Sequence, residues 1–374
     1  MIEKNWEIRS KEPFYMGDSI QQIPDVLDAC LYSSRLHSMQ SAMKHLKPSH
    51  IFTIGCGTSY NAAEAVIYFC RTMLNVPAEL FSAYDFVIDT PPGVDSNALV
   101  IAFSHTGRTL PTCLAVEKAN SLGAFTVGIS SIEDSRLVKS ANFGLVDGFG
   151  WEFRPRGKTR SFHTNCMLGM LTAMMITSPK RRKAFLHQAK DVSASIRQNL
   201  VGWEKSARYV ASHWAGVTSR YIISGYGAQK SNADESGLKI IEVLGESATS
   251  YSLEEFTHGA SASFRKDMGI ILFQTDQRSL NRCLEIARGV VISKANLVII
   301  TNQPNAGWPK NSHVIYAPFD GEYQSLSLFP VAAAAQNLLY YLAIAKGVNP
   351  DLNCSDTHPE LEDVRAIFFP PGTH

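Results

Sequence analysis

The chain lacks the features that would place it in a membrane or in an oxidising compartment. It has no run of about 18 apolar residues, so no membrane span is expected. Its charged first 13 residues carry no apolar core of a signal peptide. Its seven cysteines form no CxxC pair, which favours reduced thiols over a zinc site. We therefore expect a soluble cytoplasmic protein.

An excess of one charge is also missing, since 35 basic and 34 acidic residues leave a net charge of +1. No overall field would attract nucleic acid or a membrane surface, so any anion must be bound locally. Hydrophobic residues make up 45% of the chain, which is typical of a globular protein. A length of 374 residues fits two domains, and we place them at 1–195 and 196–374.

Short apolar segments alternate with helical patterns and predict parallel sheets covered by helices on both faces. The first 48 residues are helical in pattern. In the first half we expect strands at 50–55, 76–86, 97–103 and 124–131, and helices at 61–74 and 161–176. A polar helical stretch at 180–211 is interpreted as the bridge between the domains. The pattern then returns over 220–347, about 170 positions later, which indicates a duplicated unit.

Two loops that follow predicted strands combine glycine with hydroxyl groups: "GCGTS" (55–59) and "SHTGRT" (104–109). A glycine-rich turn after a parallel strand presents free N–H groups and a helix dipole to an anion, and hydroxyls add donors. Neither loop matches GxxxxGK[ST] or GxGxxG. Either one alone could be an ordinary helix cap. Together, after successive strands, they favour binding of a phosphate monoester.

Three segments resemble the sugar-isomerase (SIS) domain family: "GCGTSYNAAEA", "SHTGRTLPTCLAVEKANSLGAFTVGISS" and "ESGLKIIEVLGESATSYSLEEFTHGASA". The similarity covers about residues 30–350, and it is to the isomerase half of glucosamine-6-phosphate synthase and to deaminase and deglycase relatives. It implies an α/β fold with two tandem SIS domains. Each would be a parallel-sheet, three-layer α/β/α sandwich of the flavodoxin type.

The resemblance also implies that the hydroxyl loops hold the phosphate of a hexose phosphate. The implied phosphate-binding residues are Ser59, Ser104, Thr106 and Thr109, with backbone help from His105. Further candidate contacts are Gly57, Thr58, Lys158 and Thr159. The last two lie in "RGKTRSF" (156–162), which aligns with a family loop that closes over the sugar; a solvated loop is the alternative.

Moving an amine at carbon 1 or 2 of a sugar requires a carboxylate base and a second proton carrier. Glu242 and His258, sixteen positions apart, match a glutamate and a histidine of the family. The resemblance implies that Glu242 is the base and that His258 assists ring opening or protonates the leaving group. In relatives this histidine enters the partner's active site, which implies a homodimer with a shared site. Glu255 is a candidate for orienting a neighbour.

The alternatives for these residues are structural. Glu242 could be a surface residue paired with Lys239, and His258 could be an ordinary loop histidine. If Glu242 lies near the apolar face that we expect from Leu238, Ile241 and Leu244, its pKa would rise and suit a base.

Two departures from the family pattern reduce the number of reactions that the chain is expected to catalyse. "HGA" replaces the usual "HGP", and no lysine follows Lys346, although the synthases use a C-terminal lysine in ring opening. The chain starts within a helix of the SIS unit and has no cysteine at position 2, so we expect no glutaminase activity. We therefore expect a deaminase or Amadori-product deglycase acting on a 6-phosphorylated amino- or amine-substituted hexose. No metal, cofactor, nucleic acid or membrane partner is expected.

The sequence leaves three other functions open. One is an aldose–ketose isomerase, which would use the same proton transfer. The second is a sugar-phosphate sensor without activity, although no basic recognition stripe accompanies the domain. The third is a scaffold that uses the fold only to dimerise.

Overall fold

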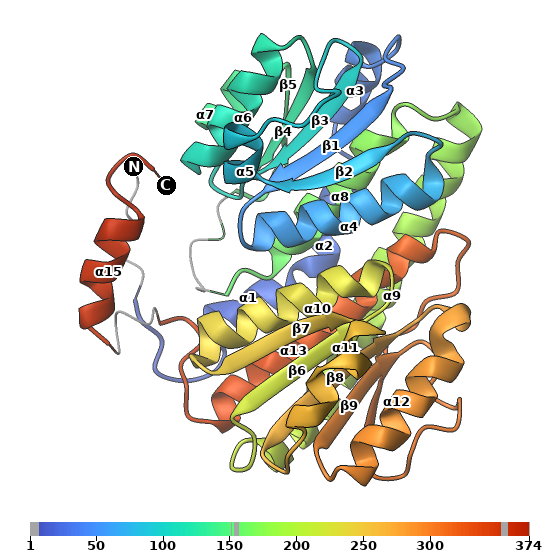
Figure 1. The fold of residues 1–374 in the computed structure, drawn as a ribbon, viewed down its shortest axis with the longest axis vertical. Helices are drawn as coiled ribbons and strands as arrows, with labels where there is room; N and C mark the ends of the chain where they lie inside the picture. The colour runs from blue at the N-terminus through green and yellow to red at the C-terminus, as the bar shows by residue number, and fades with distance from the viewer. Residues whose placement is uncertain (1–6, 151, 153–156, 353–357, 374) are drawn as a thin grey trace.

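The computed structural model describes residues 7–150, 152, 157–352 and 358–373, and it contains two five-stranded parallel sheets (Figure 1). The first sheet has the order β2-β1-β3-β4-β5. Its strands are β1 (His50–Gly55), β2 (Ala78–Ser82), β3 (Ala98–Phe103), β4 (Phe125–Ser130) and β5 (Phe143–Val146).

The second sheet repeats this arrangement with the order β10-β9-β8-β6-β7. Its strands are β6 (Arg220–Gly225), β7 (Ser247–Ser252), β8 (Met268–Gln274), β9 (Asn296–Thr301) and β10 (His313–Tyr316). Read from β7, this is the same 2-1-3-4-5 order as in the first sheet, which is the flavodoxin-type order. The predicted pair of α/β units is therefore confirmed.

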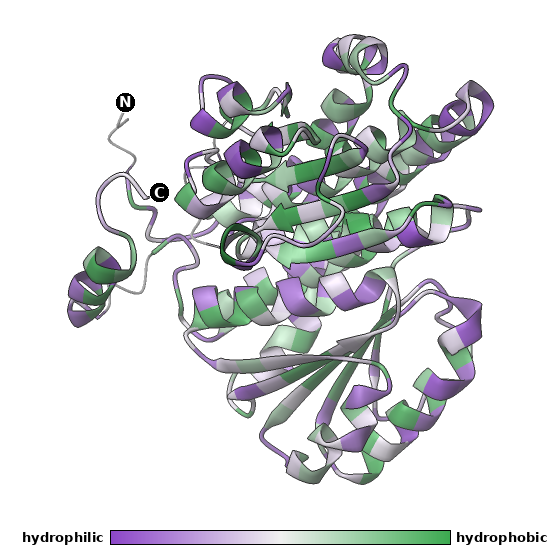
Figure 2. Ribbon diagram, turned by 45° about the horizontal axis from the view of Figure 1, so that its top comes forward, coloured by the Kyte–Doolittle hydropathy of each residue, from purple (hydrophilic) through white to green (hydrophobic). Residues whose placement is uncertain are grey.

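The inner strands are continuous apolar runs without alternation. Every residue of β3 (ALVIAF) and of β8 (MGIILFQ) is buried, as expected for parallel strands with helices on both faces. Figure 2 colours these inner strands largely green. One predicted strand is too long: the segment 76–86 ends as a strand at Ser82. There the Ser82 hydroxyl accepts a hydrogen bond from the Asp85 N–H and caps helix α5.

Helices account for most of the remaining chain. The helices of the first half are α1 (Tyr15–Gln21), α2 (Ile23–Leu31), α3 (Arg35–Ala42), α4 (Thr58–Met73), α5 (Ala83–Ile88), α6 (Leu110–Ser121), α7 (Arg136–Ser140), α8 (Arg160–Met174) and α9 (Pro179–Trp214). The later ones are α10 (Ala228–Lys239), the π-helical turn η1 (Ile240–Leu244), α11 (Glu255–His258), α12 (Leu280–Ile292), α13 (Leu328–Ala345) and α15 (Glu360–Phe368). Short 3₁₀ turns are η2 (Ala260–Ser263), η3 (Gln277–Ser279) and η4 (Gln324–Ser327).

A layer of helices between the two sheets joins the halves. Helix α4 of the first unit packs against α10 of the second, and α10 packs against α13 (Figure 1). Helix α9 contacts both α2 and α13, and the predicted boundary between 195 and 196 lies inside it. The division into two domains at that point stays a prediction.

One helical stretch, Gln324–Ala345, is long and apolar enough to cross a membrane by length and composition alone. In the structure, 89% of its most apolar window is buried inside the protein. Core helices pass the same test, so this stretch is weak evidence for a membrane span.

Candidate active site

The carboxyl edge of the first sheet has the geometry of a ligand site. Strands β1 and β3 are hydrogen-bonded neighbours, and the chain leaves them towards opposite faces of the sheet. Helix α4, after β1, packs against α8 and α10, whereas α6, after β3, packs against α5 and α7. A crevice forms at such a switch point in open parallel sheets, and ligands bind there.

The turn between β1 and α4 requires its glycines. Gly57 has φ 56° and ψ −131°, a conformation that is essentially restricted to glycine. At Gly55, an added Cβ would lie 2.6 Å from the backbone of Ser59. These glycines bring the first turn of α4 against the strand end, where the Ser59 and Tyr60 N–H groups donate to the carbonyls of Cys56 and Gly57.

The predicted phosphate-binding hydroxyls lie at this edge. Ser104 is 2% exposed, and its hydroxyl lies 3.0 Å from that of Thr109. Thr106 accepts a hydrogen bond from the Arg108 N–H in the same turn. Ser59 is buried in the first turn of α4, on the neighbouring strand connection. The fold therefore brings both hydroxyl loops to neighbouring strand ends.

A buried charged cluster connects the first loop to α10. The Thr58 hydroxyl donates to Glu235 Oε1 (3.2 Å) and accepts from Lys239 Nζ (2.8 Å). Asn61 donates to Glu235 Oε2 (2.8 Å). Burial raises the pKa of Glu235 to about 7. Burial acts to lower the pKa of Lys239, but the carboxylates of Glu235 and Glu242 outweigh it and the pKa is raised. Lys239 is therefore a buried cation next to the first loop.

Glu242 extends this cluster. Its Oε2 atom lies 2.5 Å from Lys239 Nζ, and its side chain is 27% exposed. Glu242 is therefore paired with Lys239, as the structural alternative expected. Because Lys239 also donates to the Thr58 hydroxyl, this pairing connects Glu242 to the first hydroxyl loop. The apolar face expected around Glu242 is wrong, because Ile241 is 48% exposed while Val243 is buried. The π-helical turn Ile240–Leu244 interrupts the 3.6-residue period on which that expectation rested.

Glu235 was not predicted from the sequence, and Lys239 was predicted only as a surface partner of Glu242. The signal for the buried pair was the i, i+4 spacing of Glu235 and Lys239 within α10, which places them on one helical face.

Glu152 organises the loop predicted to close over the sugar. Its carboxylate accepts hydrogen bonds from the N–H (3.0 Å) and hydroxyl (2.9 Å) of Thr159 and from the Ser161 N–H (3.1 Å) at the start of α8. Thr159 is completely buried and serves this helix start, so its hydroxyl is not an open sugar contact. Lys158 donates to the Glu152 carbonyl (2.5 Å). At Gly157, an added Cβ would lie 2.6 Å from Val243, so the loop lies on the turn that carries Glu242.

The ring of His105 is held by residues outside its own loop. Its Nδ1 atom lies 2.9 Å from the Ser131 hydroxyl, and its Nε2 atom accepts from the Glu152 N–H at 3.1 Å. Burial, with help from Lys158, lowers the pKa of His105 to about 4, so the ring is neutral. Because both ring nitrogens are engaged, a phosphate contact of His105 would come from its backbone.

His258 lies apart from Glu242 within one chain. It is exposed on α11, with Nε2 3.6 Å from Glu254 Oε1, and Glu254 is in turn held by Arg282. The neighbour of His258 is thus Glu254, whereas the predicted Glu255 is exposed. Among the described residues, no contact connects His258 to Glu242 or to the hydroxyl loops.

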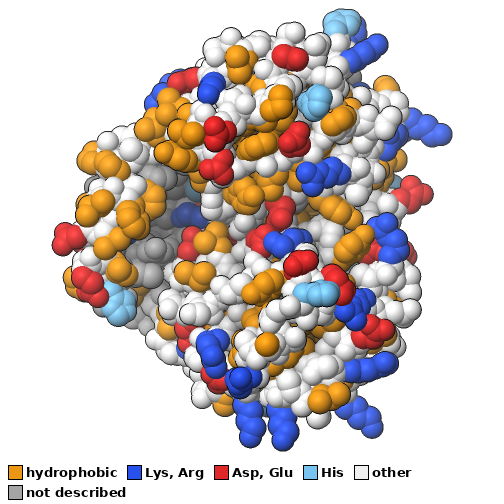
Figure 3. All heavy atoms as spheres, viewed as in Figure 1, with side chains coloured by type: hydrophobic (Ala, Val, Ile, Leu, Met, Phe, Trp, Pro, Cys, Tyr) orange, Lys and Arg blue, Asp and Glu red, His pale blue; other side chains and the backbone are white. Residues whose placement is uncertain are grey.

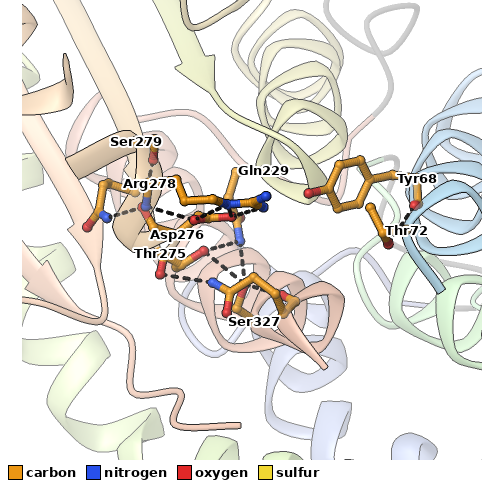
Figure 4. Close-up of polar contacts among 10 residues, drawn as sticks. Tyr68, Thr72, Gln229, Thr275, Asp276, Arg278, Ser279 and Ser327 are labelled. Atoms are coloured by element: carbon orange, nitrogen blue, oxygen red, sulfur yellow. Dashed lines mark hydrogen bonds and ion pairs between the residues drawn. The ribbon is translucent and has the colours of Figure 1, made fainter. Parts of the chain in front are cut away.

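The second sheet has an equivalent edge that is filled by its own side chains (Figure 4). Gly227 repeats the backbone of Gly57, with φ 64° and ψ −127°. The Gln229 amide donates to the hydroxyls of Thr275 (3.0 Å) and Ser327 (2.9 Å), which lie 2.9 Å from each other. These three side chains are at least 95% buried and bonded to one another.

Lys346, the last lysine, lies at the opposite end of the second unit. It donates to the carbonyl of Thr218, just before β6, and pairs with Glu246 at 2.9 Å. It is therefore distant from the edge at which β6 ends.

The end of the chain returns to the first edge. The Leu110 N–H, at the start of α6, donates to the Thr373 carbonyl (2.9 Å). The preceding helix α15 has no buried residue, and Figure 3 shows hydrophobic side chains gathered on it at the margin of the molecule. In the described residues, no group of three or more His, Cys, Asp or Glu side chains is arranged to hold a metal ion.

Comparison with known proteins agrees with the family resemblance seen in the sequence. The model of the SIS domain family matches residues 46–175, which contain both hydroxyl loops. The glutamine–fructose-6-phosphate aminotransferase (isomerizing) of Aeropyrum pernix is 27% identical over 312 residues, covering 80% of this chain and 49% of the relative. The chain thus spans about half the length of the curated relatives that it matches.

Solved structures share the whole fold. The C-terminal domain of the glucosamine-fructose-6-phosphate aminotransferase from Francisella tularensis superposes with a TM-score of 0.81 at 20% identity, covering 92% of this chain and 99% of that one. The glucosamine-6-phosphate deaminase from Thermotoga maritima gives a TM-score of 0.70 at 20% identity, covering 91% and 97%. At this identity the likeness establishes the fold alone.

Proposed function

We propose that the chain, whose residues 46–175 match the SIS domain model, is an enzyme acting on a 6-phosphorylated amino- or amine-substituted hexose. The reaction is deamination or removal of an amine from an Amadori product. One observation carries the proposal: Lys239 connects the carboxylate of Glu242 to Thr58 of the first hydroxyl loop. Thr58 directly precedes Ser59, a predicted phosphate contact. A single sugar phosphate could therefore contact this loop and the carboxylate of Glu242 at the same time.

In this proposal the phosphate binds at the first edge, to the hydroxyls of Ser59, Ser104 and Thr109 and to N–H groups of the loops. The open-chain sugar then extends towards η1. Lys239 orients Glu242 through the contact between its Nζ atom and the carboxylate. Lys158 and the start of α8, both bonded to Glu152, lie beside the sugar.

The same base serves either reaction. In deamination, Glu242 takes the proton from C2 of the 2-amino aldehyde, which forms the enolamine, and returns it to C1. Water adds to the resulting ketimine and ammonia leaves, giving the ketose phosphate. In deglycation the proton moves from C1 to C2, and hydrolysis of the aldimine at C1 gives the aldose phosphate and the free amine. Both sequences need general acid–base catalysis and no external oxidant.

A homodimer completes the proposed site. His258 is 72% exposed and meets no part of its own chain's first edge, so in this proposal it acts in the partner subunit. The residues around it line an apolar groove of about 410 Å³, which includes Phe256, Phe264 and Ile286. Ile292 beside the groove is 81% exposed, which supports contact with another surface.

The test is turnover of glucosamine 6-phosphate and of fructosyl-amino-acid 6-phosphates, measured as released ammonia or amine and as sugar phosphate formed. Glu242→Gln should lower kcat by at least about 100-fold with little change in KM. Glu246→Gln is the matched control, because Glu246 also pairs with a largely buried lysine but at the other end of the second sheet. Binding without turnover of any substrate would instead favour the sensor, and full activity of Glu242→Gln would exclude its role as the base.

A further inference from the structure

The ring of His105 bridges two loops of the first unit. His105 belongs to the phosphate loop 104–109, whereas its partners Ser131 and Glu152 lie after β4 and before α8. Because Nε2 accepts the Glu152 N–H, the proton of the neutral ring is on Nδ1, and it is donated to Ser131. The Ser131 hydroxyl in turn donates to Asp147, whose other oxygen accepts the Phe149 N–H at 2.9 Å. The donor and the acceptor of each hydrogen bond in this series are therefore assigned.

Glu152 uses all three of its polar groups in this arrangement. Its N–H binds His105, its carbonyl accepts from Lys158, and its carboxylate holds the start of α8. The next described segment begins at Gly157, which lies against Val243 and Lys239. A continuous series of contacts therefore runs from the phosphate loop through His105 and Glu152 to the helix that carries Glu242.

We propose that His105 is a positioning residue that couples the conformation of the phosphate loop to the positions of Glu152, Lys158 and the start of α8 beside the sugar. This inference rests on the proposed function. In it, His105 does not bind the phosphate through its ring; it supplies the acceptor that fixes the Glu152 backbone. A buried N–H group that loses its acceptor is costly, so Glu152 would leave this position if the ring were removed.

Two variants separate the two ring contacts. In His105→Gln the side-chain carbonyl reaches about as far as Nε2 and can still accept the Glu152 N–H. In His105→Asn the shorter side chain reaches only as far as Nδ1, so the contact with Ser131 is retained and that with Glu152 is lost. Thr126→Val is a control for destabilisation of the same sheet, because Thr126 is buried in β4 and bonded to Asn120 and Asn142, at the other end of the strand.

The binding of fructose 6-phosphate and of inorganic phosphate is measured by calorimetry, and exchange of the Glu152 amide hydrogen is measured by NMR without ligand. We expect His105→Asn to weaken fructose 6-phosphate binding about 10-fold and to accelerate Glu152 exchange about 10-fold or more, with phosphate affinity changed less than about 2-fold. His105→Gln should stay within about 3-fold of the unsubstituted protein in all three measurements. Thr126→Val should lower the melting temperature without changing the ratio of the two affinities.

An equal loss of both affinities in His105→Asn would overturn the proposal, because the ring would then be a phosphate ligand. An unchanged exchange rate of the Glu152 amide in His105→Asn would also overturn it. If the unsubstituted protein bound neither fructose 6-phosphate nor phosphate, the proposed function would fail, while the exchange measurement would still decide whether His105 holds Glu152.

Discussion

The two sheet edges share one backbone and differ in their side chains. Gly57 and Gly227 have nearly the same φ and ψ, and each starts the helix that follows the first strand of its unit. In the first unit, hydroxyl-bearing residues surround this turn. In the second, the Gln229 side chain fills the equivalent position and bonds to Thr275 and Ser327. A glycine turn at a strand end therefore permits a phosphate site but does not make one.

Two lysines of the second unit, Lys239 and Lys346, lie at different ends of the molecule's sheets and have different partners. Lys239 is completely buried between Glu235 and Glu242 at the first edge, whereas Lys346 pairs with Glu246 at the far end of the second sheet. The cationic residue of the candidate site thus comes from the second unit and acts at the edge of the first. This is a physical reason for both units to stay joined.

The largest effect is expected when Lys239 and Lys346 are each replaced by methionine and the two variants are compared. Lys239→Met leaves the carboxyl of Glu235 buried without its cation, and we expect the free energy of unfolding to fall by about 3–5 kcal/mol. Lys346→Met should also destabilise the protein but leave catalysis at the first edge unchanged. Urea unfolding and turnover, measured on both variants, check this. Equal losses of turnover in the two variants would contradict the proposal that Lys239, and not Lys346, acts at the candidate active site.

A pH effect tests the contact between the halves. Glu64 on α4 faces Asp234 and Lys230 of α10, with Arg71 and Tyr60 nearby on α4. Burial, together with Asp234, raises the pKa of Glu64 to about 8, so folding takes up a proton between its unfolded pKa and that value. This contribution is complete below about pH 4.5 and is lost as the pH rises through about 8. We expect a loss of the order of 2 kcal/mol.

Glu64→Gln removes this titration. Thermal unfolding between pH 5 and 9 should show a shallower decline in the variant than in the unsubstituted protein. Glu235, with a pKa of about 7, contributes a decline of the same sign that Glu64→Gln leaves in place. Superimposable pH profiles of variant and unsubstituted protein would contradict the assignment to Glu64.

The smallest effect compares single hydroxyls at the two edges. Ser59→Ala should weaken phosphate binding about 5- to 10-fold, the effect of one hydrogen bond to a charged ligand. Ser327→Ala should leave phosphate affinity unchanged and cost about 1–3 kcal/mol of stability, because it removes a partner of Gln229. Calorimetry should give one phosphate bound per chain. Two equivalent sites per chain would show that the second edge is open.

The sequence was sufficient for the repeated fold because its signals are local. Continuous apolar runs, glycine turns and helical periods recur about 170 positions apart, and the sheets follow them. The hydroxyl loops were located for the same reason. The strand predicted at 76–86 was too long because the Ser82 cap is a single-residue signal within an apolar stretch.

The sequence was less informative where distant segments meet. Lys239 and Glu235 matter through Thr58, about 180 positions earlier, and the π-helical turn after Lys239 has no simple pattern. His105 was expected to help bind phosphate through its backbone, and the contact of its ring with Glu152, 47 positions away, was not predicted. Such contacts depend on how the loops fold back on each other.

The most direct test is a crystal structure of Glu242→Gln, which should bind without turnover, grown with glucosamine 6-phosphate. The account predicts phosphate against Ser59, Ser104 and Thr109, and C2 of the sugar within about 3.5 Å of the substituted side chain at 242. Phosphate bound elsewhere, or a side chain at 242 directed into solvent away from the sugar, would contradict it.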